Sequence, residues 1–412
     1  MATRVVITGI GMVTPLGNDT ASTWENILAG RSGIGPITAF DASHHEVRIA
    51  GEVHDFDPLD YFDRKEARRT ERFVHFGIAA AVEAARDSGL DIASMPDDVG
   101  VVLGSGSGGL HTLEAQFHVL FERGPDRISP FCIPQLALDM GAGHVSMRLQ
   151  ARGPNYATVS ACATGANAIG EAAEIIKRGD ARAMIAGGTE AAITSMTVAA
   201  FTNMRALSFR NDDPQHASRP FDNERDGFVM GEGAGVVVLE DLELALARGA
   251  HIYAEVLGYS ATSDAHHITE PAPGGAGLAR ALRRALRKAD LDSDRVDYIN
   301  AHGTSTRFND RDESAAIRSV FGDHAYKLSV SSTKSMTGHL MGAAGGIEIA
   351  FTALALRDGM LPPTINYEHP DPECDLDYVP NVARKADIRV AISNSMGFGG
   401  HNAVVVLGKF EG

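Results

Sequence analysis

One cysteine stands where the sequence could build a nucleophile. Cys162 lies in the stretch T-V-S-A-C-A-T-G, between a β-prone run at 156–159 and a helix-prone run at 166–177. A thiol at the start of a helix lies close to unpaired N–H groups and the positive end of the helix dipole, which favour the thiolate. Small residues on both sides leave room for a substrate to approach the sulfur. The sequence therefore predicts a reactive cysteine, although an isolated free cysteine is more often a small buried residue.

Three further motifs, each at a predicted strand end, carry residue types that complement a thiol. N-A-H-G-T-S-T offers His302, with the acidic pair Asp310 and Glu313 just after it, and S-S-T-K-S-M-T-G-H offers Lys334 and His339. In S-N-S-M-G-F-G-G-H, flexible glycines bring backbone N–H groups close to a neighbouring group. Each motif alone is compatible with a packing role. Together they are the parts of covalent acyl chemistry.

Two other uses of cysteine and histidine fit less well. No two of these residues have the helical or loop spacing of zinc ligands, so a zinc site is disfavoured. A cysteine protease needs one histidine as a base, which leaves the second histidine and Lys334 unexplained.

Composition narrows the class of protein. The 412 residues are 44% hydrophobic with 44 glycines, which indicates a compact globular chain of two domains or one large two-part unit. The net charge of −16 argues against binding to nucleic acid. Three cysteines without C-x-x-C fit a reducing cytoplasm. The sequence shows no signal-peptide pattern and no apolar run of membrane-spanning length, so we expect no membrane partner.

Alternating strand and helix patterns predict an α/β fold with largely parallel, buried sheets. The chain also contains a weak internal repeat. In the first copy V-S-A-C leads to a helix ending in K-R-G-D, and in the second V-S-S-T leads through G-H-L-M-G-A-A-G-G to a helix ending in R-D-G. We interpret this as two similar halves, residues 1–250 with the nucleophile and 251–412 with the two histidines. An active site is expected where strand ends of both halves meet. The early G-I-G after the first strand is weak evidence for a nucleotide site, since it lacks the third glycine.

The motifs together resemble the β-ketoacyl-acyl carrier protein synthases, the elongating condensing enzymes of fatty-acid synthesis, and most of all their type II members. The match runs essentially end to end, from V-V-I-T-G-I-G to G-F-G-G-H-N-A. The resemblance implies a thiolase-like fold of five layers, α-β-α-β-α, and a homodimer. It implies a decarboxylative Claisen condensation, in which an acyl chain held on Cys162 and malonyl-acyl carrier protein give 3-oxoacyl-acyl carrier protein and CO2.

The resemblance also implies catalytic roles by position. Cys162 would accept the acyl group, and His302 and His339 would form the decarboxylation pair. Two imidazoles can donate N–H to the enolate oxygen only if their surroundings keep them unprotonated. Phe398 would be a gating residue, whose backbone N–H joins that of Cys162 in the oxyanion hole.

Further roles follow from the same resemblance. Lys334 would set the electrostatics of the site, paired with Glu313 and with Asp310 nearby. Thr304 and Thr306 would hydrogen-bond the phosphopantetheine arm of the carrier. Other positions expected to line the substrate site are Ser107, Cys132, Phe201, Thr269 and Gly399.

The implied reaction requires no metal and no redox cofactor, because the substrates arrive on the phosphopantetheine of acyl carrier protein. The family sometimes carries a structural monovalent cation. Its neighbourhood here would be Asn300, Glu348, Ser393 and Asn394.

The sequence departs from the family pattern at several positions. Arg307 follows H-G-T-S-T where proline is usual, and Met396 replaces a usual phenylalanine near the gate. Ser107 and Cys132 stand where bulkier apolar residues are expected in the acyl tunnel and the dimer-facing pocket. The smaller side chains predict a roomier tunnel that accepts long or branched acyl chains.

Acyl carrier protein is acidic, and so is this chain, so binding would need a local basic patch. A predicted helix is unusually basic, with Arg64, Lys65, Arg68, Arg69 and Arg72. The residues expected to bind the carrier are Lys65, Arg68, Arg69, Arg127 and Arg205.

Several residues also distinguish this chain from related classes of the same superfamily. Initiating synthases complete their triad with an asparagine, whereas here Asn394 accompanies a full G-H-L-M-G-A-A-G around His339. Thiolases place a second cysteine in the C-terminal glycine loop, but Cys374 lies in an acidic loop. A chain-length factor would lack Cys162. Two alternatives stay open: a polyketide ketosynthase with the same triad and a non-catalytic partner subunit.

Overall fold

The computed structural model describes residues 3–411, and its main strands divide into two sets of five. The first set is β1 (Val5–Val13), β4 (Val99–Gly104), β5 (Asn155–Tyr156), β6 (Ala183–Glu190) and β7 (Gly233–Asp241). The second set is β8 (Ala254–Ser263), β9 (Tyr298–Asn300), β10 (Ser329–Ser331), β13 (Val390–Gly397) and β14 (His401–Gly408). Short strands also pair outside this sheet, β2 (Gly35–Pro36) with β3 (Ile49–Ala50) and β11 (Met360–Leu361) with β12 (Arg384–Lys385).

The two sets have the same topology. In chain order, β1, β4, β5, β6 and β7 correspond to β8, β9, β10, β13 and β14, and the strand orders β5-β4-β6-β7-β1 and β10-β9-β13-β14-β8 are equivalent. Among residues 3–411, the two sets of strands pair with each other only through β1 and β8, at Val6↔Glu255 and Ile7↔Ala254. The prediction of two similar halves is confirmed, whereas a boundary at residue 250 stays a prediction.

The prediction of largely parallel sheets is wrong. The parallel pairs are β4–β5 and β4–β6 in the first half and β9–β10 and β9–β13 in the second. The remaining pairs are antiparallel, β6–β7 and β1–β7 in the first half and β13–β14 and β14–β8 in the second. In the second half the reason is local, because a short hairpin at 398–400 turns β13 straight back into β14. A crossover helix is needed only where neighbouring strands run parallel.

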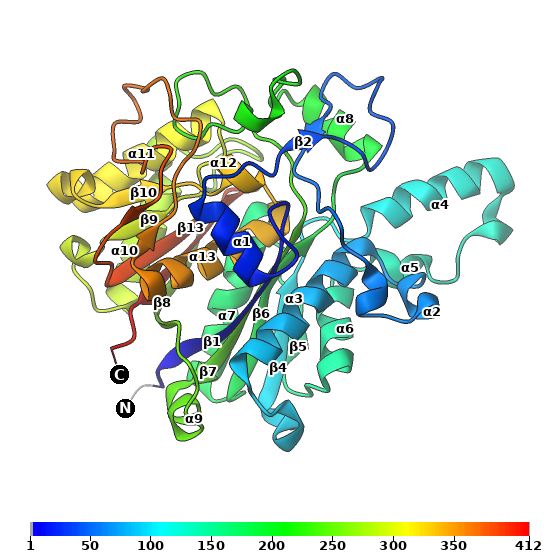
Figure 1. The fold of residues 1–412 in the computed structure, drawn as a ribbon, viewed down its shortest axis with the longest axis horizontal. Coiled ribbons are helices and arrows are strands. Elements are labelled where there is room, and N and C mark those ends of the chain that lie inside the picture. Colours follow the sequence, from blue (N-terminus) through cyan, green and yellow to red (C-terminus); the bar gives the residue numbers. More distant parts are fainter. Residues whose placement is uncertain (1–2, 412) are drawn as a thin grey trace.

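Helices lie on both faces of each set, which produces the five layers that the resemblance implies (Figure 1). On the outer face of the first set lie α3 (Arg72–Ser88) and α6 (Met140–Leu149), and on that of the second lie α10 (Ala276–Lys288) and α11 (Arg307–Phe321). The middle layer consists of α7 (Thr164–Arg178) and α13 (Ala344–Asp358). The other helices are α1 (Thr20–Leu28), α2 (Arg64–Ala67), α4 (Leu110–Arg123), α5 (Cys132–Leu136), α8 (Ser195–Asn203), α9 (Leu242–Ala247) and α12 (Lys334–Thr337).

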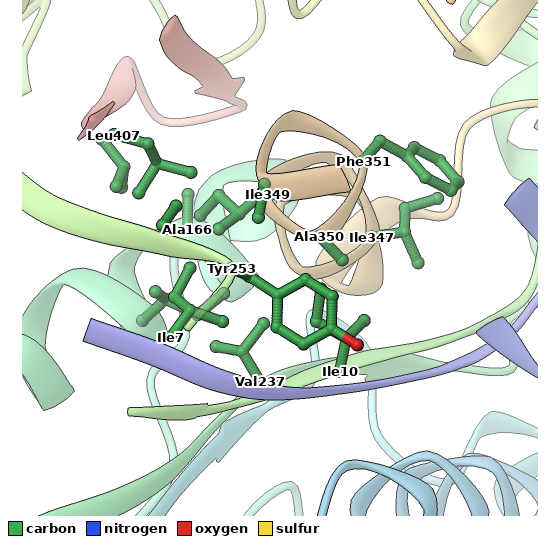
Figure 2. Close-up of a cluster of buried hydrophobic side chains, with 14 of the residues drawn as sticks. Ile7, Ile10, Ala166, Val237, Tyr253, Ile347, Ile349, Ala350, Phe351 and Leu407 are labelled. Atoms are coloured by element: carbon green, nitrogen blue, oxygen red, sulfur yellow. The ribbon is translucent and has the colours of Figure 1, made fainter. Parts of the chain in front are cut away.

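The middle layer holds the largest apolar core (Figure 2). Residues 344–356 of α13 are all buried, because sheet strands of both halves and α7 surround this helix. A helix buried on all sides is apolar all round, unlike a surface helix with one apolar stripe. The exception is Glu348, a fully buried carboxylate on this helix. Such a charge requires a partner, and the partner lies in the candidate site.

The two central helices begin side by side. A Cβ on Gly165 would lie 2.6 Å from the backbone N of Gly346, so only glycine allows this approach. Each helix follows a short 3₁₀ turn, η5 (Ala161–Ala163) before α7 and η10 (Met341–Ala343) before α13. The first residue of each turn has a left-handed backbone, with φ of 50° at Ala161 and 46° at Met341. The two halves therefore place equivalent turns at the centre of the molecule.

Two expectations about early segments change. The β-prone run at 156–159 forms only the end of β5, and the nucleophile turn follows after a short loop. The G-I-G stretch lies inside β1, which continues to Val13 and makes no nucleotide-binding turn. No helix of residues 3–411 is long and apolar enough to cross a membrane.

Candidate active site

The nucleophile turn is fixed by side-chain hydrogen bonds on both sides of Cys162. The Ser160 N–H donates to Thr164 Oγ1 at 2.9 Å, and Thr158 Oγ1 donates to the Thr164 carbonyl at 3.0 Å. Asn167 Nδ2 donates to Ser160 Oγ at 2.6 Å. These contacts hold the left-handed residue before Cys162, a conformation that non-glycine residues keep only where the surroundings enforce it. The thiol consequently has a defined position at the start of α7.

The prediction that this position favours the thiolate is wrong for the resting site. Burial raises the pKa of Cys162 to about 12, and the carboxylate of Glu190 adds to the rise. The ammonium of Lys334 and the backbone N–H of Phe398 lower the pKa, but burial outweighs them. The cysteine is therefore a neutral thiol until a substrate enters.

The two histidines lie together, as the sequence predicts. The rings of His302 and His339 have centroids 5.3 Å apart and meet edge to face at 83°. His339 also meets the ring of Phe228 edge to face. Burial lowers the pKa of both histidines well below the usual value, and Lys334 lowers both further. Both imidazoles are therefore neutral and able to donate an N–H.

Lys334 determines which nitrogen of His302 carries the proton. Its Nζ donates to the His302 carbonyl at 2.6 Å, lies 3.3 Å from His302 Nδ1 and pairs with Glu348 Oε1. A charged ammonium has only donors, so Nδ1 must accept and Nε2 must carry the hydrogen. Lys334 starts α12, which the second half inserts between β10 and the 3₁₀ turn before α13.

The predicted pairing of Lys334 with Glu313 is wrong. The lysine's partner is Glu348 on the central helix, whereas Glu313 accepts the backbone N–H groups of His302 at 2.9 Å and Gly303 at 2.8 Å. Glu313 also accepts from Asn394 Nδ2 at 3.1 Å. Glu313 thus fixes the backbone that carries the histidine. Burial raises its pKa, and these donors oppose the rise.

Asp310 supports the same region from the other side. Its carboxylate accepts the Phe221 N–H at 2.8 Å and lies 3.7 Å from Arg225 Nε. Burial raises the pKa of Asp310, and Arg225 opposes the rise. Asp310 is on α11, which begins at Arg307, so the usual proline is replaced at the first helical position. That position needs no N–H partner, and arginine is accommodated there as well as proline.

The loop between β13 and β14 brings Phe398 next to the nucleophile. A Cβ on Gly397 would lie 3.2 Å from the Cys162 backbone N, and Gly399 and Gly400 have φ of 89° and 76°. The Phe398 N–H lies beside the sulfur, where its hydrogen bond lowers the pKa of Cys162. The Phe398 ring lies 6.5 Å from that of Phe201.

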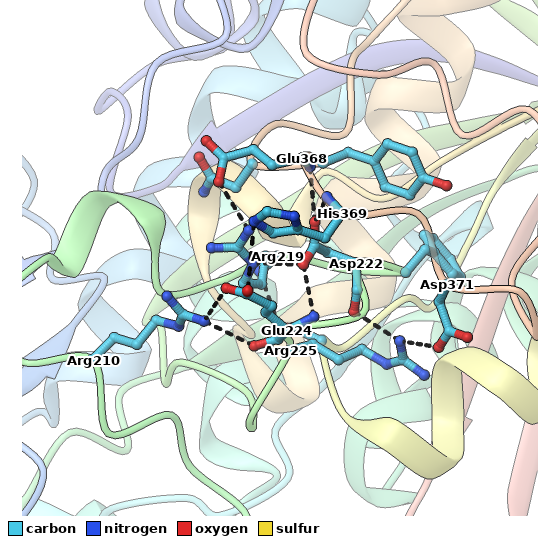
Figure 3. Close-up of polar contacts among 12 residues, drawn as sticks. Arg210, Arg219, Asp222, Glu224, Arg225, Glu368, His369 and Asp371 are labelled. Atoms are coloured by element: carbon cyan, nitrogen blue, oxygen red, sulfur yellow. Dashed lines mark hydrogen bonds and ion pairs between the residues drawn. The ribbon is translucent and has the colours of Figure 1, made fainter.

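The loop that follows His302 is braced by a buried charge network (Figure 3). Arg225 donates to the Thr306 and Arg307 carbonyls at 3.2 Å and pairs with Asp371 at 2.6 Å. Asp222, in the same network, pairs with the buried Arg219 at 2.9 Å. The hydroxyls of Thr304 and Thr306 hydrogen-bond each other at 2.8 Å, and their binding to phosphopantetheine stays a prediction.

Three of the other expected substrate residues lie in three separate segments of the chain. Ser107 is in the turn after β4, and Cys132 is the first residue of α5. Thr269 lies in the exposed segment 264–271, where the Ile268 carbonyl accepts the Gly399 N–H at 2.7 Å. Met396 is buried in the core under α10 and α11.

The predicted single basic helix does not form. The short α2 ends at Ala67, α3 begins at Arg72, and Arg72 is committed to a pair with Glu232 at 2.7 Å. Arg69 lies over the ring of Phe131 at 4.5 Å. The side chains of Arg64, Lys65, Arg68, Arg69, Arg127 and Arg205 are exposed, and Arg205 pairs with Glu46.

The expected cation position contains buried oxygens without partners. Asn300 Oδ1, Ser393 Oγ, Asn394 Oδ1 and Glu348 Oε2 are all buried and accept no hydrogen bond in the described chain. Uncompensated oxygens of this kind fit a hard cation. Burial also raises the pKa of Glu348 to about 7, and Lys334 opposes the rise. No cluster of three His, Cys, Asp or Glu residues suited to a metal occurs between residues 3 and 411.

Two residues have roles around the site that the sequence did not predict. Glu348 as the partner of Lys334 could have been found from the one charged residue in the apolar run 344–356 of α13. Glu190 follows G-G-T at the end of β6, and its four donors come from remote segments that only the fold reveals.

Family models agree with this architecture and these residues. The model of the beta-ketoacyl synthase N-terminal domain matches residues 2–245, and that of the C-terminal domain matches residues 253–368. The chain belongs to the beta-ketoacyl synthase family, and it has the thiolase-like fold of ketosynthases.

Individual relatives are similar over nearly the whole chain. The 3-oxoacyl-[acyl-carrier-protein] synthase 2 of Synechocystis is 54% identical over 99% of this chain and 98% of its own length. The protein of the same name from Staphylococcus aureus is 56% identical over 99% of both chains. A type II polyketide ketosynthase, solved with its acyl carrier protein, is 34% identical with a TM-score of 0.92 over the full length of both chains.

Proposed function

We propose that this protein is an elongating 3-oxoacyl-acyl carrier protein synthase, an acyltransferase that lengthens fatty-acyl chains by two carbons. The observation that carries the proposal is the neutral imidazole pair, with Lys334 fixing the tautomer of His302, in the site that holds Cys162. The full-length relatives with this name, at 54% and 56% identity, support the same reaction.

The first step transfers the acyl group. The sulfur of Cys162 attacks the carrier thioester, and the Cys162 and Phe398 N–H groups stabilise the tetrahedral oxyanion, each by about 3–4 kcal/mol in related chemistry. The C–S bond to the carrier breaks, and the thiol proton of Cys162 ends on the departing carrier thiol. Because the resting thiol is neutral, proton removal belongs to this step rather than to the empty enzyme.

The second step forms the new carbon–carbon bond. The malonyl carboxylate leaves as CO2, and its bonding electrons form an enolate whose oxygen accepts N–H groups from His302 and His339. The enolate carbon attacks the acyl carbonyl on Cys162, and the C–S bond breaks to release 3-oxoacyl carrier protein. The sulfur then takes a proton from solvent. Neutral imidazoles suit this role because a donor is needed and no proton is transferred.

No redox cofactor enters this chemistry, since every bond change balances among substrates and thiols. The residues with unpartnered oxygens, Asn300, Glu348, Ser393 and Asn394, would hold a monovalent cation. Such an ion would supply positive charge beside Glu348, where the carboxylate pairs with Lys334.

Acyl carrier protein is the proposed partner. The exposed guanidinium and ammonium groups of α2 and the adjoining loop give this acidic chain a local positive surface, formed by Lys65, Arg68 and Arg69. Figure 1 shows α2 beside α5, whose first residue is the expected tunnel residue Cys132. Ion pairing with an acidic carrier would bring the arm to this side of the molecule.

We also propose a homodimer. In the described residues 3–411 the strand β5 lies at the sheet edge and pairs with β4 alone, and the arm of α4 and α5 projects from the same half of the molecule (Figure 1). Apolar side chains are exposed both on this arm and just after the edge strand, with Phe121 of α4 at 81% and Val159 at 57%. An open edge with apolar neighbours fits a second copy of the chain. Light scattering that finds only monomer at micromolar concentration would contradict this.

The three free cysteines are consistent with a protein that works in the reducing cytoplasm.

The test is reconstitution with a fatty acyl carrier and malonyl carrier. The expected product is 3-oxoacyl carrier protein extended by two carbons, with release of one CO2. A polyketide ketosynthase would instead reject ordinary fatty acyl carriers and require a partner subunit. Absence of any product with both kinds of primer would favour a non-catalytic subunit.

A further inference from the structure

The fully buried Glu190 is assigned no step in the proposed mechanism, although its charge adds to the raised pKa of Cys162. It ends β6 and has no cationic partner among residues 3–411. A buried carboxylate of this kind is costly and persists only with strong hydrogen-bond donors. Burial raises the pKa of Glu190, and its hydrogen bonds oppose the rise.

Four donors from two separate segments converge on this carboxylate. Oε1 accepts from Ser105 Oγ at 2.9 Å and from the Ser107 N–H at 3.2 Å. Oε2 accepts the Gly106 N–H at 2.8 Å and the Gly342 N–H at 2.9 Å. Glu190 thereby ties the turn after β4 in the first half to the 3₁₀ turn that opens α13 in the second half.

The pseudo-symmetry of the two halves explains why the donor from Gly342 is free. Gly342 occupies in the second half the place that Cys162 occupies in the first, as the second residue of the 3₁₀ turn. The strand end beside Cys162 is Gly397, which has no side chain and leaves the Cys162 N–H open to a substrate oxygen. The equivalent strand end beside Gly342 is Glu190, whose carboxylate fills that space. In the second half, the backbone N–H of Gly342 therefore hydrogen-bonds the structural carboxylate of Glu190 and is not open to a ligand.

The turn that Glu190 holds lies between the nucleophile and the expected tunnel. A Cβ on Gly106 would lie 3.6 Å from the Ala161 carbonyl, directly before Cys162. On its other side, the Gly109 N–H donates to the Leu136 carbonyl of α5 at 3.3 Å. An acyl chain that extended from Cys162 toward α5, where the expected tunnel residue Cys132 lies, would pass this turn.

We propose that Glu190 is a positioning residue that fixes the 105–109 turn and thereby keeps the distal acyl tunnel open for long chains. This inference rests on the proposed function, because it concerns the acyl chain delivered to Cys162. Without the carboxylate, three backbone N–H groups lose their acceptor and the turn is free to relax into the tunnel. Short chains, which stay close to the sulfur, do not reach the turn.

The test compares acylation of Cys162 by butyryl and myristoyl carrier protein, followed by intact mass. In Glu190→Ala the rate ratio of myristoyl to butyryl is expected to fall about tenfold or more, while the butyryl rate changes less than about threefold. Glu190→Gln keeps the shape but only one acceptor oxygen, so two of the four donors keep their partner and its ratio is expected to fall less than that of Glu190→Ala.

The matched control is Glu240→Gln, a buried glutamate near the opposite end of the same pair of strands, which leaves the ratio unchanged. If Glu190→Ala does not fold, the double variant Ser105→Ala with Glu190→Gln should still lower the ratio. Equal losses for both chain lengths, or an unchanged ratio, overturn the inference. Failure of the native enzyme to acylate Cys162 with either carrier overturns the proposed function instead.

Discussion

The Nζ atom of Lys334 contacts His302 at two points, the carbonyl oxygen at 2.6 Å and the ring Nδ1 at 3.3 Å. One ammonium therefore fixes both the backbone and the tautomer of this histidine. It also lowers the pKa values of His302, His339 and Cys162. The lysine is thus a positioning residue for the decarboxylation half of the reaction.

Replacing Lys334 by methionine should separate the two half-reactions. Condensation with malonyl carrier is expected to fall about 100-fold or more, because the enolate loses a correctly oriented donor. Transfer of the acyl group to Cys162 should fall far less, since the oxyanion N–H groups remain. Glu348 loses its partner, but Lys334 is what holds its raised pKa down to about 7, so in the variant the pKa rises further and the carboxyl takes up a proton and stays buried.

The measurement for this variant is single-turnover acylation by intact mass beside the release of CO2 from malonyl carrier. The exposed Lys327→Met serves as the control for loss of a lysine and should retain both rates. Unchanged CO2 release in Lys334→Met would contradict the role assigned to the ammonium.

The neutral resting thiol predicts a pH profile for Cys162. Below a pKa of about 12 the thiolate fraction grows tenfold with each unit of rising pH. Alkylation by iodoacetamide should therefore keep accelerating between about pH 7 and pH 10, without a plateau. The experiment uses a chain with Cys132→Ser and Cys374→Ser, followed by mass. A plateau below about pH 8.5 would mean that the helix start and Lys334 lower the pKa of Cys162 more than burial raises it.

The small side chain of Ser107 predicts a preference for long or branched primers. Ser107→Ile should reduce kcat/KM for long acyl carriers by about tenfold while leaving short ones nearly unchanged, because the added carbons occupy the tunnel. Competition between primers of two lengths measures this ratio directly. If native activity with long primers is no higher than that of the variant, the roomier tunnel has no functional consequence.

Charge reversal on the exposed basic surface should weaken carrier binding. The double variant Lys65→Glu with Arg68→Glu is expected to raise KM for carrier substrates about tenfold at low salt, with a smaller effect at high salt. Reversal of Arg284 and Arg287 on the outer helix α10 controls for the change in net charge. An unaltered KM at low salt would remove this surface from the docking site.

The sequence predicted the chemistry better than the topology. The sequence predicted Cys162 from its strand-to-helix turn, the two histidines from glycine-flanked strand ends and Lys334 from the motif that it shares with His339. The structure brings these four residues to one centre. The sheets were predicted to be largely parallel because alternating helix and strand patterns do not record strand direction. For β13 and β14 the direction follows from the tight hairpin at 398–400.

The errors within the site have a common cause. The partner of Lys334 was assigned to Glu313 by sequence position, but Glu348 reaches it from a helix of the middle layer. The thiolate was predicted from a helix dipole, a local property, whereas burial by remote segments sets the pKa. Both depend on long-range packing, which a single sequence does not report.

The central claim is that one sulfur carries the chain and one site performs both steps. Intact-mass analysis of the protein after mixing with acyl carrier, and again after adding malonyl carrier, tests it most directly. The native chain should gain the acyl mass and then lose it as 3-oxoacyl carrier appears, while Cys162→Ala gains none. Acyl mass on Cys162→Ala, or a native adduct that malonyl carrier never discharges, would contradict the account.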